Sequence, residues 1–201
     1  GRGARLEQPN VNAQQLDLRS RVRGLPRDAA ALRRLLAALP EPPAAAGRLA
    51  VIPCAGSGTR MGALGYPKPL HPIGGVPSVV RLMEALSPHV SGFYLPVNEA
   101  PGEERLFRDA FAASGGRWET TFVPVARPLG DGDAVLHALR AMPPGFAGDI
   151  VVAWGDATIL DPEIVTLCLR ALNVLDAAAP LVVPTVFERE PYVALIRDAD
   201  G

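Results

Sequence analysis

Lysine is almost absent from this chain of 201 residues: Lys68 is the only one, and every other long cationic side chain is an arginine. The two residue types differ in kind, because lysine carries a compact point charge on a flexible stem whereas arginine carries a planar fork. A chain that places arginine almost everywhere else indicates that position 68 requires an ammonium group. The alternative, that one lysine persists by chance in an arginine-biased composition, is left open by position alone.

Other scarcities limit the class of protein. The formal net charge of −1 gives no support to nucleic-acid or membrane-surface binding, which requires a concentrated basic face. No uninterrupted apolar stretch approaches the length that crosses a bilayer, and the first residues lack the pattern of a secretory leader, so we do not expect secretion. Cys54 and Cys168 are the only cysteines and follow no metal-binding spacing, so we interpret both as reduced, mostly buried thiols. We therefore expect a cytoplasmic protein without a nucleic-acid or membrane partner.

Residues 1–47 differ in pattern from the rest and predict a helical extension followed by a Pro/Ala linker. Leucines at helical spacing predict a helix over 29–39, with Asp28 as its N-cap. We expect this extension to pack on the main domain. The alternative is that residues 12–39 form a hairpin that makes a homo-oligomer or docks a partner. Because residues 198–201 read as a hairpin turn, we expect the domain over 48–201 to be truncated at its C-terminal end.

From residue 49 onward, apolar strands alternate with helices. Strands are predicted over 49–54, 92–97, 120–125, 149–154, 181–187 and 192–197, the last of them a candidate antiparallel strand, and helices over 77–86, 103–113, 133–142 and 162–175. Asp161 is the predicted N-cap of the last helix. This alternation is typical of an α/β fold with a three-layer, mostly parallel (mixed) Rossmann-like sheet. Ligands in such sheets bind beyond the carboxyl ends of the strands.

A glycine-rich run, A-G-S-G-T-R-M-G over residues 55–62, lies at one of these strand ends. A P-loop is excluded because its spacing from glycine to Gly-Lys-Ser/Thr does not occur. A dinucleotide fingerprint also fails, because Gly62 comes one residue too late after Gly56 and Gly58. A nicotinamide oxidoreductase is therefore the weakest of the alternatives. Glycines in such a turn let backbone N–H groups approach phosphates closely.

The same run, followed by P-K-P-L over residues 67–70 and by Gly74-Gly75, resembles the triphosphate-binding signature of the sugar-1-phosphate nucleotidyltransferases. Within that superfamily it is most similar to the N-acetylglucosamine-1-phosphate uridylyltransferase type. P-L-G-D-G-D-A-V over 128–135 is similar to the family segment beside the nucleobase and ribose, and V-V-A-W-G-D over 151–156 is similar to the strand that supplies a magnesium ligand. With a weaker match over residues 192–201, the resemblance spans roughly residues 49–201.

The resemblance implies a Mg²⁺-dependent transfer of a nucleoside monophosphate from a nucleoside triphosphate to a sugar 1-phosphate or similar phosphorylated or phosphonylated acceptor, with release of pyrophosphate. It implies two catalytic residues, Arg60 on the leaving pyrophosphate and Lys68 on the reacting phosphates, and it implies that Asp156 binds Mg²⁺. The implied nucleotide-binding residues are Ala55, Gly56, Ser57, Gly58, Thr59, Gly130 and Asp131. Asp133 is more simply interpreted as a cap of the following helix.

Departures from the family pattern leave parts of this interpretation open. The glutamine by which such uridylyltransferases read uracil is replaced by V-A-R-P over residues 125–128, so the base is not fixed. Asp131 stands where the family has threonine, and its carboxylate either repels the nucleotide or assists the metal. The hairpin over 192–201 also departs, and the family's second metal ligand lies beyond residue 201. The alternative function is a non-catalytic nucleotide-sensing or scaffolding domain of the same fold.

Overall fold

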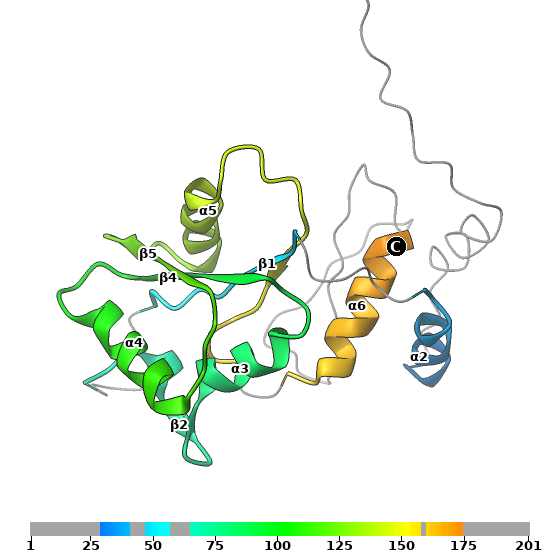
Figure 1. The fold of residues 1–201 in the computed structure, drawn as a ribbon, viewed down its shortest axis with the longest axis horizontal. Coiled ribbons are helices and arrows are strands. Elements are labelled where there is room, and N and C mark those ends of the chain that lie inside the picture. The colour runs from blue at the N-terminus through cyan, green and yellow to red at the C-terminus, as the bar shows by residue number, and fades with distance from the viewer. Residues whose placement is uncertain (1–28, 41–46, 57–64, 158–159, 175–201) are drawn as a thin grey trace, which may run out of the picture. The chain divides into compact units, whose positions relative to one another are not determined.

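The computed structural model describes residues 29–40, 47–56, 65–157 and 160–174 (Figure 1). The chain divides into two compact units, one formed by residues 41–166 and the other by residues 1–40 together with 167–201. No helix within the described ranges is long and apolar enough to cross a membrane. The boundary expected at residue 47 stays a prediction.

A four-stranded parallel sheet forms the centre of the larger unit. Its strands, in spatial order, are β5 (Thr120–Val125), β4 (Gly92–Asn98), β1 (Leu49–Val51) and β6 (Ile150–Val152). In the register of the ladder, Ala50 pairs with Phe93 on one side and with Val151 on the other. The predicted parallel sheet is confirmed, whereas the strands expected over 181–187 and 192–197 lie outside the described residues.

Helices cover both faces of this sheet, as Figure 1 shows: α3 and α4 lie on one side and α5 on the other. Their bounds are α3 (Ser78–Leu86), α4 (Glu103–Ser114) and α5 (Asp131–Ala141). The strand order explains why the helices lie on two faces. The crossovers from β1 to β4 and from β4 to β5 run in one direction along the sheet, and the crossover from β5 to β6 runs in the opposite direction. Because crossovers between parallel strands are right-handed, crossovers in opposite directions place their helices on opposite faces. The expected three-layer α/β architecture is confirmed.

The segment between β1 and α3 contains elements that the sequence patterns did not predict. A short 3-10 helix, η2 (Lys68–Leu70), precedes the antiparallel pair β2 (Pro72–Ile73) and β3 (Val76–Pro77). Gly74 and Gly75 join these strands with φ of 59° and 81°. A two-residue hairpin loop with two positive φ values favours two glycines, so the turn had a visible signal.

The core explains the apolar run of the central strands. Ala50, Val51 and Ile52 are fully buried, as is Leu95 of β4. Strands covered on both faces have no solvent side and therefore carry few polar residues. The apolar face of α3 is buried as well. The ends of β1 and β4 consequently form a firm base for the loops that follow them.

A buried arginine connects the amino ends of the strands. Arg48 is 3% exposed, and its Nη2 lies 2.9 Å from Oδ2 of Asp149, the residue before β6. Arg48 Nη1 also donates to the backbone oxygen of His89 at 3.2 Å. Burial lowers the pKa of His89, and the nearby positive charge of Arg48 lowers it further. This network lies at the opposite edge of the sheet from Ala55 and Gly56, which follow the carboxyl end of β1.

The smaller unit contains α2 (Ala29–Ala37), which confirms the helix expected over 29–39. Helix α6 (Pro162–Val174) begins in the larger unit and ends in the smaller one. Within the smaller unit, Arg170 Nη1 donates to the backbone oxygen of Ala37 at 2.8 Å. At the start of α6, Asp161 Oδ1 accepts a hydrogen bond from Glu163 N at 2.9 Å, which confirms the predicted N-cap. Asp28 and most of the segment proposed for docking lie outside the described residues.

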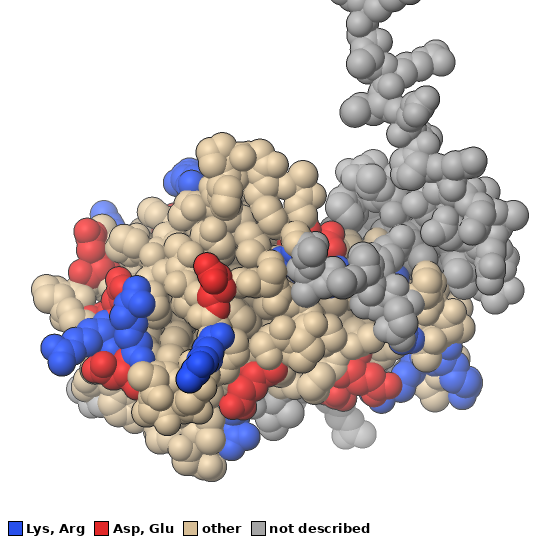
Figure 2. All heavy atoms as spheres, viewed as in Figure 1, with Lys and Arg blue, Asp and Glu red and all other residues tan. Residues whose placement is uncertain are grey.

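The larger unit presents a mixed surface. On the face shown in Figure 2, Lys and Arg side chains alternate with Asp and Glu side chains, without a broad patch of one sign. Helix α4 carries two i,i+4 ion pairs, Arg105 with Asp109 and Arg108 with Glu104. Exposed pairs of this kind contribute little to stability, about 0.2–1 kcal/mol each.

Candidate functional site

A cavity of about 260 Å³ opens at the carboxyl ends of β1 and β4, beside the first turn of α5. Its lining residues come from three segments that are far apart in the sequence: Pro53, Ala55 and Gly56; Asn98; and Pro128, Gly130, Asp131 and Ala134. This is the edge of a parallel sheet where ligands bind. Most of the described lining residues are proline, alanine and glycine, and two, Asn98 and Asp131, have polar side chains. A mostly apolar wall with few polar groups is the usual construction of a small-molecule site.

The first turn of α5 is shaped by a glycine. Gly130 is the N-cap residue and has φ 127° and ψ 178°, a conformation that residues with a Cβ rarely adopt. The helix therefore starts at Asp131 rather than at the predicted position 133. Asp133 lies in the first turn, where its Oδ2 accepts a hydrogen bond from Leu129 N at 3.3 Å. This reach back to the preceding backbone supports the structural interpretation of Asp133.

Asp131 is connected to the segment that follows β6. Trp154 Nε1 donates a hydrogen bond to Asp131 Oδ2 at 2.9 Å, although the indole side chain is largely exposed. The bond joins two strand ends, because Asp131 follows β5 and Trp154 follows β6. It fixes one carboxylate oxygen of Asp131 beside the cavity.

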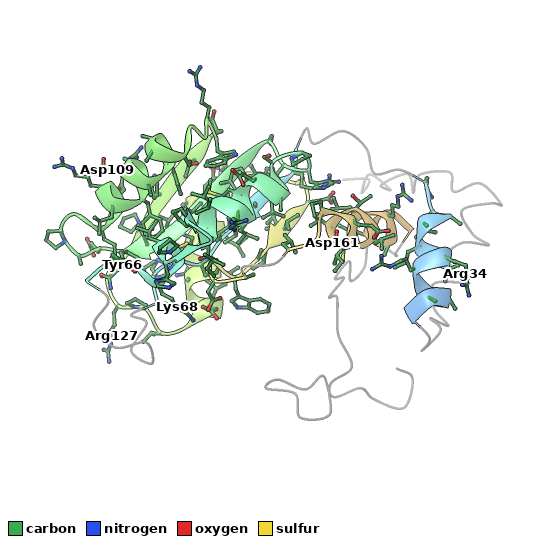
Figure 3. All side chains as sticks on the ribbon, turned by 90° about the horizontal axis from the view of Figure 1, so that it is seen from below. Arg34, Tyr66, Lys68, Asp109, Arg127 and Asp161 are labelled. Atoms are coloured by element: carbon green, nitrogen blue, oxygen red, sulfur yellow. The ribbon has the colours of Figure 1, made fainter. Side chains whose placement is uncertain are left out.

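Lys68 and Asp156 form an ion pair, with Lys68 Nζ 2.5 Å from Asp156 Oδ2. Lys68 begins η2, and Asp156 lies in the turn that follows β6. Figure 3 labels Lys68 beside Tyr66, whose hydroxyl lies 2.9 Å from His71 Nδ1. The side chain of Lys68 is 36% exposed and that of Asp156 is 45% exposed, so an anionic ligand can reach the ion pair.

A single buried hydroxyl lies between the two segments that carry this pair. Ser78, the first residue of α3, is 2% exposed, and its Oγ lies 2.9 Å from the backbone oxygen of Pro69 and 3.1 Å from that of Gly155. Pro69 is adjacent to Lys68, and Gly155 is adjacent to Asp156. Ser78 therefore links the backbone on both sides of the ion pair.

Position 155 requires a glycine because a side chain would have no room there, and not because of the backbone conformation. A Cβ at this position would stand 2.9 Å from Cys54 Sγ and 2.9 Å from the backbone oxygen of Pro53. The turn that carries Asp156 therefore packs directly on the end of β1. Burial raises the pKa of the Cys54 thiol well above its ordinary value, and the carboxylates of Asp156 and Glu103 add to the effect, so this thiol stays protonated. Cys54 is thus a packing residue at this site.

The structure places the predicted site residues in two groups. Ala55, Gly56, Gly130 and Asp131 line the cavity, and Lys68 and Asp156 form the ion pair. Ser57, Gly58, Thr59 and Arg60 lie outside the described residues. Sequence reasoning missed Asn98, Ser78 and Trp154. Asn98 had a signal, because it is a polar residue at the carboxyl end of a predicted strand.

A candidate metal ligand is present, although a multidentate cluster is not. In the part of the chain that the structure describes, no three His, Cys, Asp or Glu side chains come together. Asp156 offers a partly exposed carboxylate beside Lys68. Mg²⁺ keeps several waters and is commonly bound by one or two carboxylates together with substrate phosphates, so a single carboxylate fits its requirements.

The chain belongs to the family described as MobA-like NTP transferase domain, whose model matches residues 50–199. The match begins in β1 and includes the cavity, Lys68 and Asp156. The fold and the family together define a nucleotidyltransferase domain, as the sequence motifs predicted.

Curated relatives agree with this assignment. The bifunctional protein GlmU of Mycolicibacterium paratuberculosis is 32% identical over 153 residues, which cover 73% of this chain and 30% of the relative. GlmU of Nocardia farcinica is 34% identical over 158 residues, covering 75% and 31%. GlmU of Chelativorans sp. is 35% identical over 159 residues, covering 75% and 34%. The chain thus spans about a third of the length of these relatives.

Two solved structures show a partial likeness. The inositol-1-phosphate CTP transferase of T. maritima has a TM-score of 0.45 and 21% identity, covering 54% of this chain and 43% of that one. HddC of Yersinia pseudotuberculosis, complexed with GMP-PN, has a TM-score of 0.44 and 27% identity, covering 54% and 47%. At these scores the family assignment rests on the sequence matches.

Proposed function

We propose that this chain carries the nucleotide-binding site of a Mg²⁺-dependent nucleotidyltransferase that joins a nucleoside monophosphate to a sugar 1-phosphate or a similar phosphorylated or phosphonylated molecule. The observation that carries the proposal is the Lys68–Asp156 pair, in which Asp156 follows the carboxyl end of β6, at the same edge of the sheet as the cavity. The resemblance of residues 55–75 to the signature of the sugar-1-phosphate nucleotidyltransferases supports a sugar phosphate as the acceptor class.

The reaction needs positioning and charge neutralisation more than covalent help. An oxygen of the acceptor phosphate attacks the α-phosphorus of the triphosphate. The new P–O bond forms as the bond to the β-phosphate oxygen breaks, and pyrophosphate leaves in line. Lys68 brings a positive charge to the reacting phosphates, and Arg60 is the proposed partner on the leaving pyrophosphate. Both act on charge that grows in the transition state.

Asp156 is the proposed ligand of Mg²⁺. When bound there with the nucleotide, the ion would neutralise phosphate charge and fix the phosphate oxygens. Asp156 would supply a carboxylate ligand to the ion, and Ser78 and Gly155 hold the turn that presents it. Ala55 and Gly56 expose backbone at the cavity wall, where a nucleotide can approach closely.

A pyrophosphate-release assay tests this function. The protein is given each nucleoside triphosphate, Mg²⁺ and a panel of sugar 1-phosphates, and released pyrophosphate is quantified. We expect turnover with one triphosphate and a loss of about ten- to a hundred-fold in kcat/KM in Lys68→Ala, the value of one charge-assisted phosphate contact.

Arg117→Ala is the matched control. Arg117 is exposed and precedes β5, so it lies at the amino edge of the sheet, away from the site. This variant should retain wild-type turnover. Binding of a nucleoside triphosphate without release of its pyrophosphate, whichever acceptor is supplied, would contradict the enzyme and favour the non-catalytic sensing or scaffolding domain.

A further inference from the structure

Lys68 lies on a short element that has few backbone hydrogen bonds of its own. The 3-10 helix η2 contains three residues. Leu70 N donates to the backbone oxygen of Pro67, and His71 N donates to that of Lys68, each at 2.9 Å. Helices of this type are used in short pieces, and their hydrogen-bond geometry is poorer than that of an α-helix. Contacts from outside η2 therefore matter for the position of the Lys68 backbone.

The start of α3 provides the first of these contacts. Ser78 Oγ donates to the backbone oxygen of Pro69 at 2.9 Å, and Ser78 N donates to the backbone oxygen of His71 at 3.1 Å. Ser78 is 2% exposed and Pro69 is buried. The chain that follows Lys68 is therefore attached to the core, whereas these bonds do not reach the residues that precede Lys68.

A contact between two side chains connects the residues on either side of Lys68. The hydroxyl of Tyr66 lies 2.9 Å from Nδ1 of His71, and the two rings stack with centroids 6.2 Å apart and an angle of 11° between their planes. Tyr66 precedes Lys68 by two positions and His71 follows it by three, so the Tyr66–His71 contact spans η2. Because Ser78 holds the backbone of His71, this contact ties the preceding chain to the same anchor.

The Tyr66–His71 contact lies in an exposed setting, and Tyr66 is 38% exposed. Exposed contacts of this kind have small effects on global stability. A local effect is more direct, because the lysine stem is flexible and the place of its ammonium depends on how firmly the backbone beneath it is held. Groups held in position before the reaction lower its barrier, since less freedom is lost when the substrate is bound.

We propose that Tyr66 and His71 are positioning residues of Lys68, and that their contact holds η2 so that the Lys68 ammonium meets the phosphates of a bound nucleoside triphosphate. The inference rests on the proposed function and adds to it two residues that act through Lys68 and do not touch the nucleotide. Sequence analysis had no reason to join them, because neither belongs to the residues that the motifs select.

Titration calorimetry of the protein with ATP, GTP, CTP and UTP in Mg²⁺ tests this role. Tyr66→Phe keeps the stacked ring and removes the hydroxyl. We expect the affinity for the triphosphate that the wild type binds to fall about three- to five-fold, the value of one hydrogen bond. Tyr94→Phe is the matched control, because it deletes a hydroxyl from β4, where Tyr94 packs against the core around Val51. This variant should keep the wild-type affinity.

A double-mutant cycle with Lys68→Ala separates positioning from other roles of Tyr66. If Tyr66 acts through Lys68, its hydroxyl has nothing left to position once the ammonium is gone. Tyr66→Phe should then weaken binding by less than about two-fold in the Lys68→Ala background, although it weakens wild-type binding more. A hydroxyl that contacts the nucleotide, or that supports the site as a whole, would give the same loss in both backgrounds.

Two substitutions at His71 test the other side of the contact. Asn carries its amide atoms two bonds from Cβ, as histidine carries Nδ1, and the amide can accept or donate a hydrogen bond. His71→Asn should therefore stay within about two-fold of wild-type affinity, whereas His71→Leu should lose about as much as Tyr66→Phe. Thermal melting checks that each variant is folded, and the conservative variants Tyr66→Phe and His71→Asn decide the outcome if His71→Leu is not.

Distinct outcomes overturn distinct statements. Wild-type affinity in Tyr66→Phe, beside a loss in Lys68→Ala, would overturn the positioning role and leave the proposed function standing. Additive losses in the double variant would also overturn it. A loss in His71→Asn as large as that in Tyr66→Phe would overturn the role of the His71 hydrogen bond. No binding of any triphosphate to the wild type would overturn both this inference and the proposed function.

Discussion

Lys68 Nζ lies 2.5 Å from Asp156 Oδ2, although 88 positions separate the two residues in the sequence. The pair exists because β1 and β6 are neighbours, so that the segments leaving their carboxyl ends meet. Under the proposed function, a triphosphate that enters with Mg²⁺ would offer both groups a stronger partner: phosphate oxygens for the ammonium and the metal for the carboxylate. The side chains of Lys68 and Asp156 therefore already lie together before a ligand binds.

Removal of the Asp156 carboxylate should show how nucleotide affinity depends on the metal. Asp156→Asn deletes a negative charge beside an anionic ligand and releases Lys68. We expect affinity for metal-free triphosphate, measured by calorimetry in EDTA, to rise about two- to five-fold, the value of an exposed ion pair. We also expect added Mg²⁺ to improve wild-type binding and to have little effect on the variant. A variant that responds to Mg²⁺ as the wild type does would contradict the metal role of Asp156.

Ser78 should affect stability and the site together. Ser78→Ala leaves the backbone oxygens of Pro69 and Gly155 without their shared donor, so the free energy of unfolding should fall by about 1–2 kcal/mol. Nucleotide affinity should fall as well, because the turns beside Lys68 and Asp156 lose their common link. Urea unfolding and calorimetry measure the two effects.

The control for this prediction lies at the other end of α3. Ser87 Oγ donates to the backbone oxygen of Glu84 at 3.0 Å in an exposed setting. Ser87→Ala should change stability by less than about 0.5 kcal/mol and leave nucleotide affinity intact. Equal effects of the two variants would contradict a special role for Ser78.

Arg48 should stabilise the sheet without a role in binding. Arg48→Met removes a buried guanidinium and leaves Asp149 unpaired; because that carboxylate is 40% exposed, we expect a loss of about 2–3 kcal/mol, below the range for fully buried pairs. Urea unfolding checks the value. In the double variant Arg48→Met/Asp149→Asn, part of the loss should be recovered, since no charge is then left without a partner. Additive losses in the double variant would contradict this interaction.

His89 should make stability fall with acidity. Its pKa is lowered in the folded protein by burial and then by Arg48, so the unfolded chain takes up a proton near its ordinary pKa of 6.5 before the folded chain does. Stability is therefore highest above that pH and declines as the pH falls through it. We expect His89→Asn to flatten this part of the profile in urea unfolding between pH 8 and 5. The same slope in wild type and variant would assign the effect to another group.

Several features of the fold could be predicted from local patterns because local rules decide them. The strand at 120–125 agrees with β5 at both ends, since its apolar run is bounded by turn residues. β1 is shorter than the predicted 49–54, yet Cys54 N still donates to the backbone oxygen of Pro96, so the chain remains extended to that point. The helix expected at 133 starts at Asp131 because Gly130, not Gly132, has the positive φ of the N-cap.

The contacts that build the site could not be predicted in the same way, because they depend on which strands are neighbours. The sequence placed Asp131 near a nucleotide by resemblance, but it gave no reason to connect Asp131 with Trp154 across two strand ends. Ser78 looked like an ordinary residue at the start of a helix, and its function depends on two backbone oxygens brought together by tertiary packing. Asn98 becomes a cavity residue only when β4 lies next to β1.

The most direct test of the account is calorimetric titration of the protein with each nucleoside triphosphate in Mg²⁺, wild type beside Lys68→Ala. The account predicts that one triphosphate binds clearly and that Lys68→Ala weakens this binding about ten- to a hundred-fold, because one charge-assisted phosphate contact is lost. Equal affinity in the two proteins, or no binding of any triphosphate to the wild type, would contradict a polyphosphate site at Lys68.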